Sequence, residues 1–208
     1  MSNLDVVGKS VPRKESLDKV TGRARYTNDY EAPELLHARM VTSPYAHAKI
    51  KSIEYESSLS ASGVRAVLTG QYFPQLTGST VVDRPPIAID KVRYNGEPVA
   101  VVVADSEAEA EKAAQLIRVE YEPLAVVNSP SEALKEDAPL VHERLDRYNI
   151  IYEVFPEAGT NIANRTKIRK GDINKGWNES SVTVEASFSF PPSDHAAIET
   201  RCARAEIL

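Results

Sequence analysis

The most regular hydrophobic pattern of the chain lies between residues 91 and 123. Asn95 and Gly96 form a strong turn signal, because both residue types tolerate positive φ. After this turn, residues 99–104 read VAVVVA and are apolar at every position. A short apolar run without polar alternation is typical of a strand that is covered on both faces, and Pro98, which lacks an amide donor, suits the first position of such a strand. The pattern therefore predicts a buried strand.

A helix is predicted directly after this strand. Residues 106–109 read SEAE, the form of a capping box, in which a serine and a glutamate satisfy free amides at a helix start. Small apolar side chains then recur with helical spacing on one face, at Ala110, Ala113, Ala114 and Ile117. Residues 119–122 alternate again before Pro123. Together these patterns predict a strand–helix–strand unit whose helix lies close to a sheet.

Weaker patterns surround this unit. In the first of three further strands, Leu36, Ala38 and Met40 share one face and His37 and Arg39 the other. The three predicted strands are residues 35–42, 48–51 and 64–68. Short helical turns are predicted at residues 57–62, 130–135 and 173–177, and a long surface loop, rich in glycine and proline, at residues 70–90.

The clearest alternation of apolar and polar residues lies near the C-terminus. In residues 182–190, the apolar side chains occupy every second position, which predicts a half-buried strand. A short strand is also predicted to start at Ile168. Residues 203–207 alternate until the chain stops, so we expect a strand that is cut and that exposes an unpaired, aggregation-prone edge.

Composition narrows the class of protein. With 208 residues, 42% hydrophobic and 26% charged, the chain fits one large or two modest globular domains. Its single cysteine, Cys202, excludes a disulfide within the chain and any multi-cysteine zinc or iron–sulfur site. No apolar run approaches the ~20 residues of a membrane span, and no secretory signal is visible. We therefore expect a cytoplasmic protein without membrane contact, and the net charge of −5 argues against nucleic acid as a partner.

One tight cluster of reactive residue types is present: His195, Glu199 and Cys202. A thiol beside an imidazole is a possible nucleophile pair, but a lone cysteine is more often a small buried hydrophobic residue. His195 and Glu199 have the spacing of one helix face and are a possible metal pair. Because no third ligand is visible, a structural hydrogen bond or helix pair is the favoured interpretation.

The remaining candidates have simpler explanations. The scattered histidines are expected at a surface or interface; they are His37, His47 and His142. Gly70 and Gly78 lack the spacing of a phosphate-binding loop. The charged residues of the predicted helix are expected on its solvated face; they are Glu107, Glu109, Glu111 and Lys112. Four basic residues either form a patch that faces a partner subunit or, as the favoured interpretation, lie on solvated faces; they are Arg23, Arg25, Arg39 and Lys49.

Several stretches, in one order along the chain, resemble the large molybdenum-binding subunit of the xanthine dehydrogenase and aldehyde oxidase family. The matching stretches are GRARYTND (22–29), SPYAHA (43–48), GVRAVLT (63–69), VRYNGEPVA (92–100), VEYEPL (119–124), GD (171–172), HAAIE (195–199) and RA (204–205). Blocks in a common order are more specific than any single motif. The resemblance covers roughly residues 8–208.

This resemblance implies an α+β fold: an α/β hammerhead domain, with a mixed sheet and packed helices, followed by the start of a second α+β, molybdopterin-binding domain. The implied organisation is an N-terminal arm (1–17), the hammerhead domain (18–137), a linker (138–162) and the incomplete beginning of the molybdopterin-binding domain (163–208). The family's cofactor-binding loops and catalytic glutamate would lie beyond residue 208. No catalytic, cofactor-binding or metal-binding residue is therefore assigned to this chain.

The resemblance further implies that the intact enzyme hydroxylates a purine, another N-heterocycle or an aldehyde, with a molybdopterin cofactor and with iron–sulfur and FAD subunits as electron partners. In that setting the chain alone is expected to be an inactive scaffold. The alternative is a stand-alone, non-enzymatic binding or assembly module with the same fold. A small Ser/His/Asp hydrolase lacks a supporting nucleophile-elbow motif.

Overall fold

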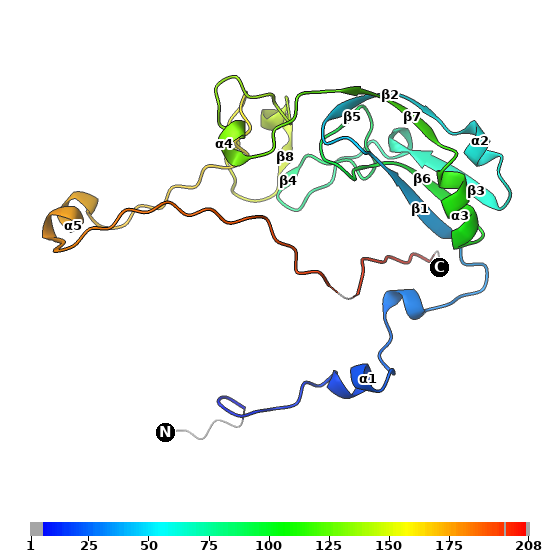
Figure 1. Ribbon diagram of the computed structural model, residues 1–208, viewed down its shortest axis with the longest axis horizontal. Coiled ribbons are helices and arrows are strands. Elements are labelled where there is room, and N and C mark those ends of the chain that lie inside the picture. Colours follow the sequence, from blue (N-terminus) through cyan, green and yellow to red (C-terminus); the bar gives the residue numbers. More distant parts are fainter. Residues whose placement is uncertain (1–5, 198, 207–208) are drawn as a thin grey trace. The chain divides into compact units, whose positions relative to one another are not determined.

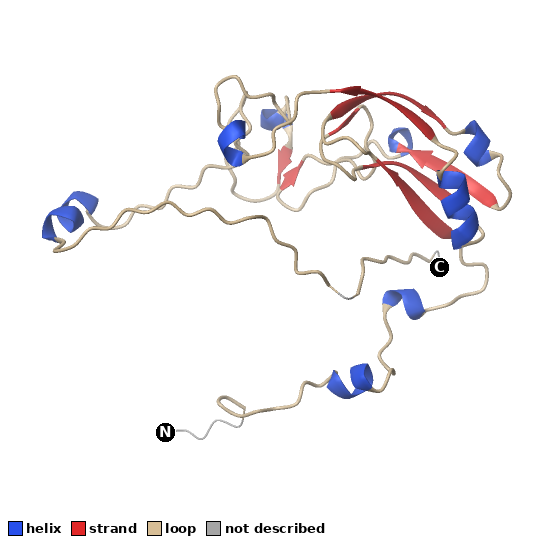
Figure 2. Cartoon of the chain, in the orientation of Figure 1, coloured by secondary structure: helices blue, strands red, loops and turns tan. Residues whose placement is uncertain are grey.

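The computed structural model describes residues 6–197 and 199–206 of the chain. These residues form two compact units. The first extends from Leu36 to Glu179 and contains all the named strands. The second combines the segments before Leu36 and after Glu179. Figures 1 and 2 show the strands and helices of the first unit, which carries the core.

The described residues contain the following helices and strands. The strands are β1 (His37–Thr42), β2 (Ala48–Glu54), β3 (Val64–Thr69), β4 (Val81–Val82), β5 (Lys91–Val92), β6 (Pro98–Ala104), β7 (Arg118–Pro123) and β8 (Asn149–Ile150). The α-helices are α1 (Ser16–Val20), α2 (Glu56–Leu59), α3 (Glu107–Ala114), α4 (Pro130–Ala133) and α5 (Ile173–Glu179). Short 3-10 turns occupy Thr27–Asp29, Gly70–Tyr72 and Leu145–Arg147.

Two three-stranded sheets contribute to two hydrophobic clusters. The first has the strand order β1-β6-β3 and the second β5-β2-β7, and a separate small ladder joins β4 to β8. The α+β fold class is confirmed. Within it, all pairs between named strands are antiparallel, whereas a mixed sheet was expected. The reason is that α3 leads the chain from β6 in one sheet to β7 in the other, so this strand–helix–strand unit does not place two parallel strands side by side.

Strand β6 is the centre of the first sheet, as its apolar pattern predicts. Val99, Ala100, Val102 and Ala104 are fully buried. Ala100 and Val102 pack with Val67 and with α3 residues, while Val99 packs in a second cluster with residues of the other sheet. Because opposite faces of a strand alternate, these two clusters cover β6 on both sides.

Helix α3 begins at the predicted cap. The Oγ of Ser106 accepts the amide of Glu109 at 3.3 Å and donates to the carboxylate of Glu109 at 2.7 Å. The predicted face of small residues is buried, since Ala110 and Ala113 are each 1% exposed. This face lies against β1 and β6 (Figure 1). Leu36, just before β1, and Met40 on β1 are exposed, and it is Val41, on the opposite face of the strand, that packs into the core.

Three predicted strands are not strands in this structure. Residues 182–190 have no regular secondary structure, and their apolar side chains are exposed, with Phe190 at 86%. Ile168 is also exposed and lies outside any strand. Residues 203–206 are irregular, and position 207 lies outside the described residues. A strand needs a neighbour for its backbone N–H and C=O groups, and the described residues provide none for these segments.

Two segments contain more structure than their sequence suggests. The predicted surface loop at 70–90 includes β4 and buries Ile87 and Ala88. The segment 138–162 forms β8, and the side-chain amide of Asn161 donates to the backbone carbonyls of Ala133 and Pro139. The domain boundaries given above stay a prediction. No helix in the described part of the chain is long and apolar enough to cross a membrane.

Candidate functional site

The turn between β5 and β6 brings buried charged groups together. Gly96 adopts a φ of +88°, which a glycine tolerates best, and its amide donates to the carbonyl of Ser43 at 2.8 Å. The side chain of Asn95 donates to the carbonyl of Pro44, also at 2.8 Å. These bonds fix the turn on the segment that links β1 to β2. The residues on either side of the turn are consequently held in place.

Glu97 places a carboxylate inside the protein. It is 2% exposed, and its Oε2 accepts the backbone amide of Arg93 at 2.5 Å. Burial raises the pKa of this carboxyl, and the amide bonds from Arg93 and Tyr94 and the positive charges of Arg93 and Arg84 only partly oppose the rise. The carboxylate of Glu97 thus connects the two ends of the turn, but burial makes its charged form unfavourable.

This unfavourable charge predicts a pH effect for the variant Glu97→Gln. A carboxyl whose folded-state pKa lies above its ordinary value of 4.5 destabilises the fold at pH values above that raised pKa, and the penalty disappears as the group is protonated. Glutamine is neutral and keeps an oxygen acceptor for the amide of Arg93. We expect the unfolding free energy of the wild type, relative to Glu97→Gln, to fall as the pH rises from below 4.5. Urea denaturation of both proteins across this range measures the difference, and a constant or rising difference contradicts the prediction.

Lys91 forms an ion pair that joins β5 to the segment after α4. Its side chain is 7% exposed, and its Nζ lies 2.6 Å from Oε1 of Glu143. Partial burial pushes the pKa of the Glu143 carboxyl up, but the hydrogen bond and the charge of Lys91 outweigh this, and the net pKa is lowered. The Nε of Arg93 donates to the carbonyl of Val141 at 3.2 Å, next to this pair. Residues 141–143 are therefore held by the basic side chains of Lys91, in β5, and Arg93, directly after it.

The two partners of this ion pair should respond differently to removal. We expect Glu143→Ala to cost about 1–2 kcal/mol, because it leaves the buried ammonium of Lys91 unpaired; the exposed position of Glu143 keeps the cost moderate. Lys91→Met replaces the buried group by an apolar side chain of similar length and should cost less than about 1 kcal/mol. Chemical denaturation of both variants measures this order. A larger cost for Lys91→Met would mean that the ion pair itself is a net source of stability.

His142 lies beside this ion pair. Its Nδ1 is 3.0 Å from the hydroxyl of Tyr148, and the two rings meet edge to face. Its Nε2 is 3.7 Å from a carboxylate oxygen of Asp83. Burial, followed by the charge of Arg93, lowers the pKa of His142, and the nearby Asp83 only partly offsets this. The imidazole is thus favoured in its neutral form, which can accept and donate hydrogen bonds.

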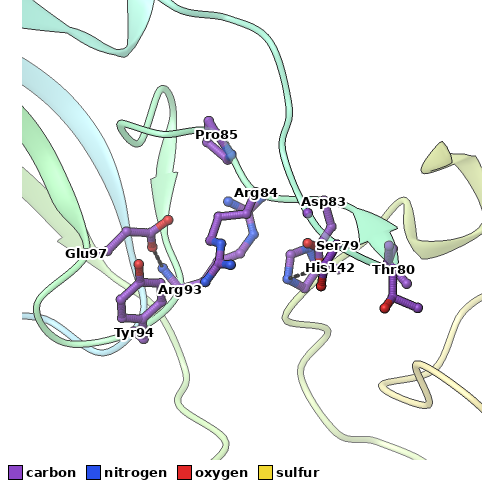
Figure 3. A pocket seen from close by; sticks show the side chains of 11 residues that line it. Ser79, Thr80, Asp83, Arg84, Pro85, Arg93, Tyr94, Glu97 and His142 are labelled. Atoms are coloured by element: carbon purple, nitrogen blue, oxygen red, sulfur yellow. Dashed lines mark hydrogen bonds and ion pairs between the residues drawn. The ribbon is translucent and has the colours of Figure 1, made fainter. Parts of the chain in front are cut away.

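These groups surround a pocket of about 390 Å³. Figure 3 shows Arg84 between a group formed by Arg93 and Glu97 and a group formed by Asp83 and His142. A neighbouring pocket of about 450 Å³ shares Asp83 and His142 with it. Both have the size of small-molecule sites. Their arrangement can bind a polar molecule, whereas no group of three or more His, Cys, Asp or Glu side chains that could hold a metal is found among the described residues.

His195, Glu199 and Cys202, the reactive residue types that lie close in the sequence, make none of the contacts with one another that the sequence suggested among the described hydrogen bonds and ion pairs. His195 is exposed and lies 3.1 Å from Asp194, its neighbour in the chain. The Sγ of Cys202 is 3.9 Å from the side-chain oxygen of Asn28, and Cys202 is exposed where a buried residue was favoured. No described hydrogen bond joins His195 to Glu199 or to Cys202. Residues 195–197 and 199 are not helical, so the spacing that suggested a shared helix face does not apply.

The other candidates are distributed over separate contacts. His47, expected near the surface, is buried; its Nδ1–H donates to the carbonyl of Ala125 at 2.6 Å. Arg39 pairs with Glu111, and Lys49 with Glu122. The remaining candidates also have local roles or lie at the surface: Arg23 bonds to Thr21, Arg25 bonds to the Asp29 carbonyl, Glu109 bonds to Ser106, His37 is half-buried, and Glu107 and Lys112 are exposed.

Of the residues that line the pocket, sequence reasoning weighed only Gly78 and His142, and expected His142 at a surface or interface. Lys91, Arg93 and Glu97 lie around the predicted turn, but charged residues beside a turn are usually solvated. The available signal was the alternation of Lys91 and Arg93 with Val92 directly before the turn. Asp83, Arg84 and His142 come from segments with no periodic pattern, so only the folded chain brings them to this place.

Comparison with known proteins identifies a family. Residues 21–125 match the model for the aldehyde oxidase and xanthine dehydrogenase a/b hammerhead domain. A probable xanthine dehydrogenase subunit of Bacillus subtilis is 33% identical over 190 residues, covering 90% of this chain and 24% of that protein. The large molybdopterin subunit of nicotinate dehydrogenase of Eubacterium barkeri is 31% identical over 196 residues, covering 93% of this chain and 43% of that protein.

Two solved structures are also similar to this chain. Quinoline 2-oxidoreductase from Pseudomonas putida 86 is 40% identical, with a TM-score of 0.56 over 63% of this chain and 18% of that chain. The aldehyde oxidoreductase of Desulfovibrio gigas is 34% identical, with a TM-score of 0.57 over 63% of this chain and 16% of that chain. This chain thus spans between about a quarter and less than half the length of the two curated relatives.

Proposed function

Because this chain belongs to the aldehyde oxidase and xanthine dehydrogenase family, we propose that it forms the hammerhead-bearing scaffold of a molybdenum hydroxylase large subunit. The observation that carries the proposal is the match of residues 21–125 to the hammerhead domain, together with two hydrophobic clusters to which both sheets contribute over the same residues. The relatives are large subunits of molybdenum hydroxylases.

The proposed reaction belongs to the intact enzyme. It is the hydroxylation of an aldehyde, a purine or another N-heterocycle, with the oxygen derived from water. The names of the relatives include xanthine, nicotinate, quinoline and aldehyde enzymes, which supports this range of substrates and does not select one of them.

We place the molybdopterin cofactor outside the residues of this chain. The donor set supports that placement. The only thiol, that of Cys202, is exposed, and its described contact is with the side-chain oxygen of Asn28. We therefore assign no chemical step to the residues of this chain. The proposed contribution of the chain is a rigid framework, a wall of the enzyme's substrate channel and an interface.

The proposed partners follow from the same family. They are an iron–sulfur subunit and an FAD subunit, which would pass electrons from the molybdenum centre to an acceptor. A cytoplasmic setting is part of the proposal. The proposal of partner subunits is supported by the names of relatives, such as subunit gamma of the 6-hydroxypseudooxynicotine dehydrogenase complex of Paenarthrobacter nicotinovorans.

Elemental analysis tests the scaffold proposal. The 208-residue chain, purified from cells supplied with molybdate, should contain molybdenum far below one atom per chain and should not oxidise aldehydes, purines or nicotinate with an artificial electron acceptor. Stoichiometric molybdenum, or turnover by the chain alone, contradicts the proposal. Sequencing the gene beyond codon 208 distinguishes the alternative: glycine-rich loops and a distant glutamate codon support a hydroxylase, whereas an immediate stop codon supports a stand-alone binding module.

A further inference from the structure

The pocket around Arg84 contains a cation without a partner. The guanidinium of Arg84 lines the pocket and forms no hydrogen bond or ion pair within the described part of the chain, although it contributes to the positive potential at Glu97. Its backbone, by contrast, is fixed: the amide and carbonyl of Arg84 both bond to Thr77, at 3.1 and 2.7 Å. A fixed backbone with an unpaired charged side chain is an arrangement that a ligand could complete.

A second guanidinium is held beside it. Arg93 donates from Nε to the carbonyl of Val141 and from Nη1 to the carbonyl of Lys91, at 3.2 and 3.3 Å. These neutral acceptors fix the plane of the group but do not neutralise its charge. The carboxylate of Glu97, which also lines the pocket, accepts the backbone amide of Arg93. Figure 3 shows both arginine side chains reaching the same space.

The other pocket walls are suited to more than a bare ion. Tyr94 supplies an aromatic ring, and Val81 and Pro85 supply apolar surface. The volume of about 390 Å³ greatly exceeds that of a single small anion. The carboxylate of Asp83 lies toward His142 and away from Arg93 (Figure 3). Two guanidinium groups beside an aromatic ring match a flat molecule that carries one carboxylate, because the planar fork of arginine pairs with both carboxylate oxygens.

We propose that this pocket binds a small aromatic carboxylate, with the carboxylate between Arg84 and Arg93 and the ring against Tyr94. The proposed binding uses only residues of this chain and needs no molybdenum cofactor. It therefore stands or fails independently of the proposed function.

Titration of the purified 208-residue chain with sodium benzoate, followed by ¹H–¹⁵N NMR, tests the proposal. We expect saturable shifts of the amide signals of Arg93 and Tyr94 and of the Arg93 Nε–H signal, with a Kd of about 1 mM for so small a ligand. Arg84→Gln should raise the Kd about tenfold or more, because it removes a charge-assisted, bidentate contact. Lys112→Gln is the matched control: it removes one positive charge from an exposed position of α3 outside the pocket and should leave the Kd unchanged.

Two further probes separate the parts of the ligand. Benzamide keeps the ring without the charge, and inorganic phosphate keeps the charge without the ring; both should bind at least about tenfold more weakly than benzoate. The absence of saturable shifts with benzoate up to about 20 mM would overturn the proposal. So would equal losses in Arg84→Gln and Lys112→Gln, or binding of benzamide or phosphate as tight as that of benzoate.

Discussion

The variant Val102→Asp is expected to lose the folded state of the first unit. Val102 is fully buried in β6 and packs among Val67, Ala113 and Ile117. A carboxylate at this position would have no described polar partner, and burying an unpaired charge costs at least about 4 kcal/mol. Because small domains are stable by only about 5–15 kcal/mol, most of the stability would be lost. Circular dichroism during thermal unfolding should show a much lower or absent cooperative transition.

The same substitution at Val184 provides the control. The sequence pattern places Val102 and Val184 in strands alike, but Val184 is 83% exposed and lies in no strand. Val184→Asp should change the unfolding free energy by less than about 0.5 kcal/mol. Similar losses in the two variants would contradict the description of residues 182–190 as solvent-exposed, and a cooperative, wild-type-like transition of Val102→Asp would contradict the position of β6 in the core.

Gly70→Ala is expected to destabilise the first unit by steric overlap with the backbone of residues 87–88. Gly70 follows β3, and a methyl group on its Cα would lie 2.5 Å from the carbonyl oxygen of Ala88 and 2.7 Å from that of Ile87. Both distances are well inside van der Waals contact with backbone that is itself buried, so the segment 87–88 would have to move. Overpacking of this kind typically costs about 3 kcal/mol at its upper end. Urea denaturation at constant pH measures the loss.

Gly96→Ala separates steric overlap from backbone strain. Gly96 has a φ of +88°, but a methyl group there would meet nothing within 4 Å. Its expected cost is the conformational one alone, about 1 kcal/mol. If Gly96→Ala proved as costly as Gly70→Ala, close packing of residues 87–88 on Gly70 would not be the dominant effect.

The sequence was sufficient to predict those elements that are determined by residues close to one another in the chain. The cap at Ser106, the small face with Ala110 and Ala113, and the apolar run of β6 each depend on residues within a few positions, and the structure contains all three. The same reasoning was wrong for residues 182–190. Alternation reports which side chains a strand would bury, but a strand also requires a neighbouring strand, and no local pattern reports its presence.

The candidate site could not be predicted for a related reason. Nothing local distinguishes Lys91, which is buried, from Lys112, which is exposed. The difference arises from Glu143, 52 residues further along the chain, which supplies the counter-charge. Likewise, Arg84 and His142 reach one pocket because the β4–β8 ladder joins residues 81–82 to 149–150, a pairing of two-residue strands that leaves no periodic signature.

The strand order β1-β6-β3 has a consequence for biosynthesis. Both outer strands of this sheet precede the middle one in the chain, and β2 likewise precedes both of its neighbours, β5 and β7. When the chain has emerged from the ribosome only as far as residue 90, β1, β2 and β3 are therefore present without the strands that they pair with in the finished protein. Sheets built from such distant pairings form slowly and leave sticky intermediates exposed. The nascent chain should consequently depend on holding chaperones until residues 98–123 emerge and both sheets can close.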